Sequence, residues 1–145
     1  MIKTYNPNYK SRVEKFLERQ FFMKHIHFSL SEIGEGSTEG WLPLEEVHLQ
    51  QKGVVHGGVI ATLADSTMGF AAYTLLADDQ HVVTGELKVS YLNPGIGDRL
   101  WVKGWVLKQG KKVNFCESEV YAYNGEERKL IAKASATMIT IFPEK

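Results

Sequence analysis

The chain contains a single cysteine, Cys116, among its 145 residues. One cysteine cannot form an internal disulfide and leaves no cysteine cluster for a metal site, so the sequence fits a reducing compartment. No run of about eighteen apolar residues occurs, and the first residues lack the apolar core of a secretion signal. We therefore expect a cytoplasmic protein that does not use a membrane as a partner.

An excess charge of either sign is also missing, because seventeen basic residues balance seventeen acidic ones. A neutral chain has no long-range field that attracts nucleic acid, so we expect no nucleic-acid partner. Near-zero net charge also gives weak protection against self-association. With 43% hydrophobic and 23% charged residues, the composition is typical of one globular domain over residues 1–145.

The N-terminal part of the chain predicts one helix and one strand. Asn6 followed by Pro7 is typical of a helix start, and apolar residues then recur at helical spacing. This pattern predicts an amphipathic helix over residues 7–21. Glycines interrupt residues 28–47, and residues 37–47 are the best candidate for a first strand.

Residues 57–76 predict a helix that has no polar face. Val59, Ile60 and Leu63 begin an apolar stripe, and small residues such as Ala61 and Ala64 cover much of the rest. A helix that is apolar all round is buried on every side. We therefore expect a sheet to cover one side of this helix and a second subunit to cover the other.

Four strands are predicted after this helix, at residues 81–92, 98–109, 112–124 and 127–142. Turn residues separate them, and short turns between consecutive strands predict an antiparallel meander. One face of the last two strands carries small side chains that allow a helix to approach. The opposite faces carry bulky aromatic residues, which indicates a further interface and a tetramer. These aromatic residues are Trp101, Trp105, Phe115 and Tyr121.

The predicted buried helix carries one ionisable residue, Asp65. Burying a carboxylate only for packing is costly, and carboxylates in clefts are enriched at functional sites, so we interpret Asp65 as catalytic. A structural alternative is that a basic group or backbone donors pair with it. Directly before the helix, His56-Gly57-Gly58 leaves free backbone N–H groups that could stabilise an oxyanion. The alternative there is a plain glycine turn.

Spacing separates these two features within one chain. Asp65 lies about two turns, roughly 10 Å along the axis, from the N-terminus of its own helix. If two subunits pack their central helices antiparallel, Asp65 of one chain can face the N-terminal amides of the other. The site would then exist only in a homodimer.

The segments 48–58, Leu63-Ala64-Asp65-Ser66 and Tyr91-Leu92-Asn93-Pro94 resemble the hotdog-fold thioesterase superfamily, in the branch related to phenylacetic-acid-pathway thioesterases. The resemblance spans residues 38–142. It implies an α+β fold, in which an antiparallel sheet wraps a long central helix, and homodimers that often form homotetramers. It also implies hydrolysis of an acyl- or aryl-acyl-CoA thioester. Coenzyme A would be part of the substrate, and no separate cofactor is expected.

The same resemblance implies roles for individual residues. Gly57 would polarise the thioester carbonyl through its backbone N–H, while Asp65 of the partner chain would activate water or attack directly. His56 would orient the turn or bond near the carbonyl, although it is equally suited to capping the helix. Thr84 would help to hold the water, but strict alternation along its strand leaves its direction open. Gln50 stands where this branch commonly has asparagine and offers the same amide one methylene farther out.

Coenzyme A is anionic, so a local cationic group is expected despite the neutral total. The candidates for its phosphates are Lys108, Lys111 and Lys112, which flank a predicted turn. The expected lining of the acyl pocket is Gly58, Leu63, Met68, Phe70 and Tyr73.

Two other functions are alternatives to hydrolysis. A hotdog domain that binds acyl-CoA without cleaving it would keep the glycine turn but would not need Asp65. A hydratase or dehydratase would pair a histidine with an acid in a different local motif, which this sequence lacks. No metal is expected, because the five histidines show only one close pair, His25 and His27, and no further ligand spacing.

Overall fold

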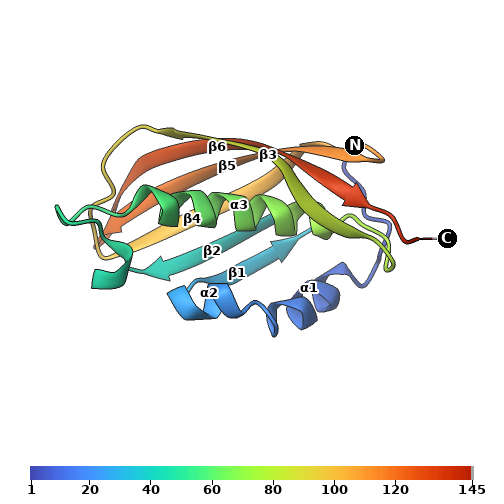
Figure 1. The fold of residues 1–145 in the computed structure, drawn as a ribbon, viewed down its shortest axis with the longest axis horizontal. Helices are drawn as coiled ribbons and strands as arrows, with labels where there is room; N and C mark the ends of the chain where they lie inside the picture. The colour runs from blue at the N-terminus through green and yellow to red at the C-terminus, as the bar shows by residue number, and fades with distance from the viewer. Residues whose placement is uncertain (145) are drawn as a thin grey trace.

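The structure is a computed structural model that describes residues 1–144. Two short helices come first and are followed by a pair of strands, a 3-10 turn, one long helix and four long strands (Figure 1). In chain order the elements are α1 (Tyr9–Leu17), α2 (Phe21–Ile26), β1 (Ser29–Gly34), β2 (Ser37–Pro43), η1 (Glu46–His48), α3 (Gly57–Tyr73), β3 (His81–Tyr91), β4 (Arg99–Lys108), β5 (Val113–Asn124) and β6 (Glu127–Ile141).

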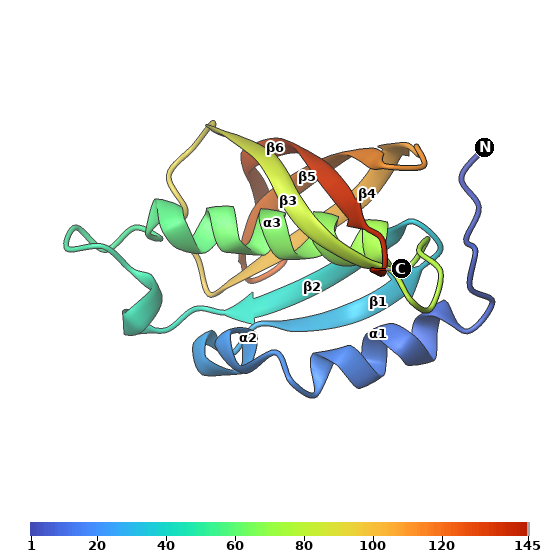
Figure 2. The ribbon, with the colours of Figure 1, turned by 45° about the vertical axis from the view of Figure 1, so that its right-hand side comes forward.

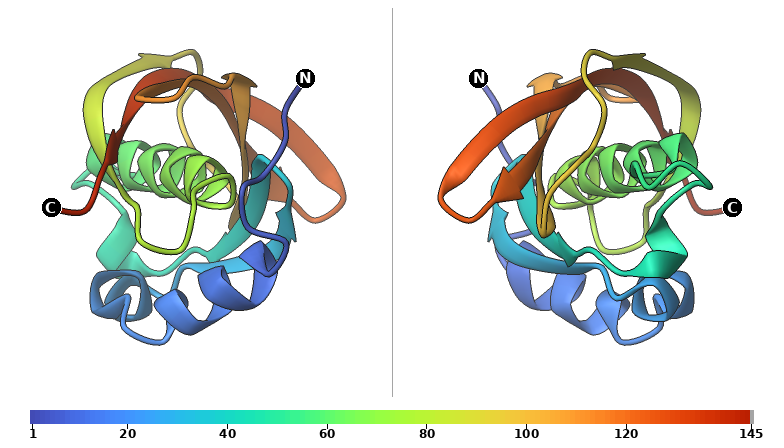
Figure 3. Two further views of the ribbon diagram at one scale, coloured as in Figure 1. Left: turned by 90° about the vertical axis from the view of Figure 1, so that its right-hand side faces the viewer. Right: turned by 90° about the vertical axis from the view of Figure 1, so that its left-hand side faces the viewer.

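All six strands form one antiparallel sheet in the order β1-β2-β4-β5-β6-β3. The sheet curls around α3, which lies along its inner face, while α1 and α2 run outside β1 (Figures 2 and 3). The predicted α+β architecture of a long central helix wrapped by an antiparallel sheet is therefore confirmed. None of the helices formed by residues 1–144 is long and apolar enough to cross a bilayer.

The helix and the sheet approach each other closely at Gly104 on β4. A Cβ atom at this position would lie 2.6 Å from the carbonyl carbon of Thr67, so only glycine fits. Leu63 and Met68 point into the same layer and are fully buried. Burial of such side chains against the sheet supplies the hydrophobic stabilisation that fixes α3 in place.

The opposite side of α3 is not covered by the chain itself. Ala61, Thr62, Asp65, Ser66 and Gly69 recur on one helical face and remain half-buried. The sequence predicted burial on every side, and the single chain provides it on the sheet side only.

The predicted meander is wrong for β3. This strand pairs with β6 at the far edge of the sheet, whereas β4 pairs with β2 and β5. The connection between β3 and β4 crosses the end of the sheet, because the side chain of Asn93 donates to the Leu130 carbonyl and the Asp98 N–H donates to the Tyr123 carbonyl. Turn residues in the sequence marked a break in the chain but could not show which strands pair.

The N-terminal prediction also needs correction. The helix predicted over residues 7–21 ends at Leu17, a second helix begins at Phe21, and β1 precedes the strand that was expected to be first. The expected strand over residues 37–47 ends at Pro43, which lacks the N–H that a sheet ladder needs.

Candidate active site

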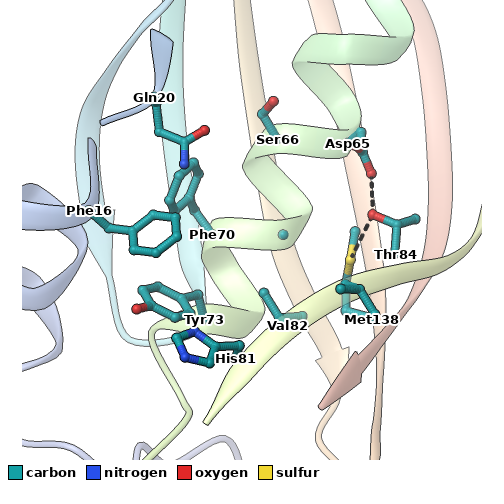
Figure 4. A pocket seen from close by; sticks show the side chains of 12 residues that line it. Phe16, Gln20, Asp65, Ser66, Phe70, Tyr73, His81, Val82, Thr84 and Met138 are labelled. Carbon is teal, nitrogen blue, oxygen red and sulfur yellow. Dashed lines mark hydrogen bonds between the residues drawn. The ribbon is translucent and has the colours of Figure 1, made fainter. Parts of the chain in front are cut away.

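Asp65 lies in the middle of α3 and is bonded to the edge strand β3. The hydroxyl of Thr84 donates to Oδ1 of Asp65 at 2.7 Å and also lies 3.6 Å from the sulfur of Met138 (Figure 4). No ion pair within residues 1–144 involves Asp65. The structural alternative of a basic partner is therefore absent from the described residues, and the second carboxylate oxygen stays open for a further donor.

A β-bulge directs Thr84 toward α3. The pairing register of β3 with β6 shifts between Thr84 and Glu86, so that Gly85 is the extra residue. Without the bulge, Thr84 would share the outward face of Glu86 and Lys88. A Cβ atom at Gly85 would lie 2.8 Å from Cγ1 of Ile139, which explains glycine at this position. One inserted residue thus determines the direction of the Thr84 side chain, which strict alternation had left open.

The start of α3 forms the second part of the candidate site. His56 is the N-cap residue, and its Nδ1 accepts a hydrogen bond from the Gly58 N–H at 2.9 Å. The hydroxyl of Tyr91 donates to the Gly57 carbonyl at 2.8 Å. Within residues 1–144 the Gly57 N–H has no acceptor. The cap therefore occupies one amide of this turn and leaves the neighbouring amide as a free donor at a helix N-terminus.

A cavity of about 250 Å³ opens beside Asp65 (Figure 4). It is lined by α3, β3, one residue of β6 and the end of α1 with the residues that follow it. The lining residues are Phe16, Gln20, Asp65, Ser66, Gly69, Phe70, Tyr73, His81, Val82, Val83, Thr84 and Met138. A second hollow, of about 380 Å³, adjoins Gly57 and is lined by Val54, Val55, Ile60 and residues 91–95. The two hollows share no residue, so each contains one of the two candidate groups.

The structure brings together only some of the predicted pocket residues. Phe70 and Tyr73 line the cavity beside Asp65. Leu63 and Met68 do not, because both are packed between α3 and the sheet. Gly58 is exposed on the first turn of α3 and lines neither hollow.

Gln50 and the three predicted lysines lie away from both hollows. The side-chain oxygen of Gln50 accepts a hydrogen bond from the Lys52 N–H at 2.6 Å and so stabilises its own turn. Lys108, Lys111 and Lys112 are exposed around the β4–β5 turn, beside the N-terminal segment and at the end of the molecule where α3 finishes (Figure 1). Within one chain they are far from Gly57, and their contact with coenzyme A stays a prediction.

Eight of the twelve residues that line this cavity were not predicted from the sequence, among them Phe16, Gln20 and His81. Phe16 follows the apolar spacing of α1, which indicated only a helix that packs on another element, whereas Gln20 is a polar residue between α1 and α2. No local signal shows that α1 reaches a helix about fifty residues later in the chain. Tertiary packing alone brings these residues to Asp65.

Known proteins are similar to this chain in sequence and fold. A model of the thioesterase superfamily matches residues 52–129. Acyl-coenzyme A thioesterase 13 of Mus musculus is 31% identical over 99 residues, which cover 66% of this chain and 67% of the mouse protein. A crystal structure of a thioesterase family protein from Silicibacter pomeroyi has a TM-score of 0.90 and 30% identity, and covers 92% of this chain and 98% of that one.

A more distant structure agrees in fold. The Escherichia coli PaaI protein from the phenylacetic acid degradation operon has a TM-score of 0.83 at 20% identity, and the alignment covers 94% of this chain and 95% of PaaI. Its likeness shows the shared fold alone. Together with the extent of the family match, these relatives show that the chain belongs to the thioesterase superfamily, has its hotdog fold and is a thioester hydrolase.

Proposed function

We propose that this chain hydrolyses the thioester of an acyl- or aryl-acyl-CoA at a site built from two subunits. The observation that carries the proposal is the separation of the two candidate groups along α3. Asp65 and the free Gly57 N–H belong to different hollows, on the order of 10 Å apart along the helix axis. Groups that act on one carbonyl must lie within about 3–3.5 Å of the reacting atoms, so the two groups of one chain cannot serve the same thioester.

Two surfaces of the chain support a shared site. The outer edge of β3 has no strand partner within residues 1–144, and an open edge of this length favours pairing with another strand. The uncovered face of α3, around Asp65 and Gly69, lies on the same side as β3. Antiparallel pairing of two β3 strands would continue the sheet and set the two α3 helices antiparallel. Asp65 of one chain would then approach Gly57 of its partner.

The chemistry follows from this arrangement. Asp65 removes a proton from a water molecule as the water oxygen bonds to the thioester carbon, while the Gly57 N–H of the partner subunit donates to the carbonyl oxygen as it becomes negative. The tetrahedral intermediate then expels the CoA sulfur, which takes up the proton, and the free acid remains. In the alternative route Asp65 attacks the carbonyl carbon itself, and water hydrolyses the resulting anhydride. Thr84 orients the carboxylate in both routes.

The substrate class rests on the relatives and on the cavity. The mouse relative is named as an acyl-coenzyme A thioesterase, and the mixed lining of the cavity beside Asp65 includes apolar and aromatic side chains, such as Phe16, Phe70 and Val82, that can contact an acyl group. A free-thiol assay over short, medium, long and aromatic acyl-CoAs tests the reaction. We expect Asp65→Asn to reduce kcat on the order of 10²- to 10⁴-fold while the oligomer persists in size-exclusion chromatography with light scattering. Undiminished turnover by the variant would contradict the mechanism, and a wild type that binds but cleaves no acyl-CoA would be a binding module.

Mixing two inactive variants tests the sharing of the site. Gly57→Pro removes the free N–H, and proline is favoured at the first position of a helix. His56 before it already has ψ 132°, which is compatible with a following proline. A mixed dimer of Asp65→Asn and Gly57→Pro chains contains one intact site and one doubly defective site. Random reassociation should therefore restore about a quarter of the wild-type activity.

The outcome separates the two architectures directly. Each variant alone should lose on the order of 10²-fold or more in kcat, since one lost oxyanion donor or one lost base has this effect. Recovery on mixing requires groups from different chains in one site. If the mixture is no more active than its two components, each chain contains a complete site and the shared arrangement is wrong.

A further inference from the structure

Gly69 is a glycine that its own chain does not explain. It lies within α3, one turn after Asp65, where glycine is less favourable than any residue except proline. Its φ is not positive, so the backbone conformation does not require glycine. A Cβ atom there would meet no atom within 4 Å. Gly104, by contrast, is glycine because a Cβ atom would overlap α3.

The space above Gly69 is the cavity beside Asp65. Phe16 of α1 stands on the opposite side of this cavity (Figure 4). Its ring lies 6.3 Å from the ring of Phe70 and 5.1 Å from that of Tyr73, measured between centroids. These three rings form an aromatic wall, and Gly69 forms the floor between that wall and Asp65.

The wall is held in place by Arg12. Its guanidinium stacks 4.2 Å above the ring of Tyr73 and donates to the carbonyls of Ala77 at 2.8 Å and Leu76 at 3.1 Å. It also donates to the carbonyls of Asp78 and Gln80. Four carbonyls bonded by one side chain fix α1 against the end of α3 and the start of β3. Phe16 is therefore a fixed wall of the cavity.

We propose that Gly69 and Phe16 set the size of the acyl group, and this inference rests on the proposed hydrolysis at Asp65. The thioester lies at Asp65, and the acyl group runs over Gly69 toward the aromatic wall. The cavity, at about 250 Å³, exceeds the roughly 150 Å³ that holds a benzene ring. It accepts an apolar acyl group of one aromatic ring or an aliphatic chain of similar volume.

Two substitutions from opposite sides test the inference. Gly69→Leu fills the floor, so kcat/KM for ring-sized acyl-CoAs should fall at least about 10-fold more than kcat/KM for acetyl-CoA. Gly69→Ala should produce a smaller shift in the same direction and raise the Tm, because alanine is the better helix former. Phe16→Ala removes the wall and should raise kcat/KM for longer acyl-CoAs relative to the wild type.

Ala61→Leu is the control for crowding between subunits, because Ala61 lies midway between Gly57 and Asp65, where the two antiparallel α3 helices of the proposed dimer would meet. Ala61 lies two turns before Gly69 on the same uncovered face of α3 and lines neither hollow. Any loss caused by this variant should be the same for every acyl length. The inference is overturned if Gly69→Leu lowers kcat/KM equally for all acyl lengths, or if light scattering shows that the variant dissociates the oligomer. Gly69 would then make room for a partner helix.

A wild type that hydrolyses no acyl-CoA would refute the proposed function separately. The same series is then measured as Kd by calorimetry. If Gly69→Leu selectively weakens the binding of ring-sized acyl-CoAs, the inference is still supported. Equal affinities for all variants would overturn it.

Discussion

Two positions on α3 are each tied to β3 by a hydrogen bond from a hydroxyl group. The two ties differ in the group that accepts the bond. Thr84 donates to the carboxylate of Asp65 at 2.7 Å, and Tyr91 donates to the carbonyl of Gly57 at 2.8 Å. The first bond reaches a side chain that we propose to react. The second reaches a backbone carbonyl and leaves the Gly57 N–H free. One strand thus positions both parts of the candidate site, but it contacts a proposed reacting group in only one of them.

The largest effect in this comparison is expected for Thr84→Val, which keeps the shape and removes the hydroxyl. A hydrogen bond to a charged group contributes about 1.5–3 kcal/mol, so kcat should fall on the order of 10- to 100-fold. Steady-state kinetics on the best acyl-CoA measures the loss, and Thr84→Ser is the control that restores the donor. Wild-type kcat in the valine variant would show that Asp65 does not depend on this bond.

A smaller effect is expected for Tyr91→Phe. The variant loses one hydrogen bond to a backbone carbonyl, so the free energy of unfolding should fall by about 0.5–1.5 kcal/mol. Because the Gly57 N–H is untouched, kcat should change by less than about threefold. Urea denaturation and the free-thiol assay measure the two quantities. A kcat loss as large as that of Thr84→Val would place the Tyr91 hydroxyl on the substrate and erase the difference between the two ties.

The smallest effect is expected for labelling of the thiol of Cys116, a buried residue of β5. Burial raises the pKa of its thiol to about 12, so near neutral pH the thiol stays protonated and does not react. Ellman's reagent should detect no thiol in the folded protein and one per chain in denaturant. An unreactive Cys116 adds no background signal to the free-thiol assay that both predictions above use. Rapid labelling of the folded protein would instead show that the layer between α3 and the sheet opens.

Much of the fold could be predicted because hydrophobic spacing is local. The apolar sequence of residues 57–76 predicted α3 at Gly57–Tyr73. Alternation of apolar and polar residues predicted β4, β5 and β6 nearly to their ends. Strand pairing depends on contacts between distant segments, so the place of β3 beyond β6 was not predictable from turn residues. The same holds for the break between α1 and α2.

The residues of the candidate site also differ in whether local sequence features or contacts between distant segments reveal them. Asp65 and His56-Gly57-Gly58 stand out in sequence because a charge on an apolar helix and a glycine pair at its start are local features. Thr84 needed knowledge of the bulge at Gly85, which changes the face of the strand. Phe16 needed the contact of α1 with the end of α3, which Arg12 makes by stacking on Tyr73 and by bonding backbone carbonyls of the following segment, and any sequence would present such carbonyls.

The position of α1 has a consequence for how such an enzyme diverges. The superfamily match covers residues 52–129, which include Asp65, Gly57 and Thr84, whereas α1 lies before it. Substitutions in α1 can reshape the wall at Phe16 while the groups that we propose to react stay unchanged. Gly69, Phe70 and Tyr73 lie inside the matched stretch, so only the part of the proposed acyl selectivity that depends on Phe16 is encoded apart from the reacting groups, and that part can change independently.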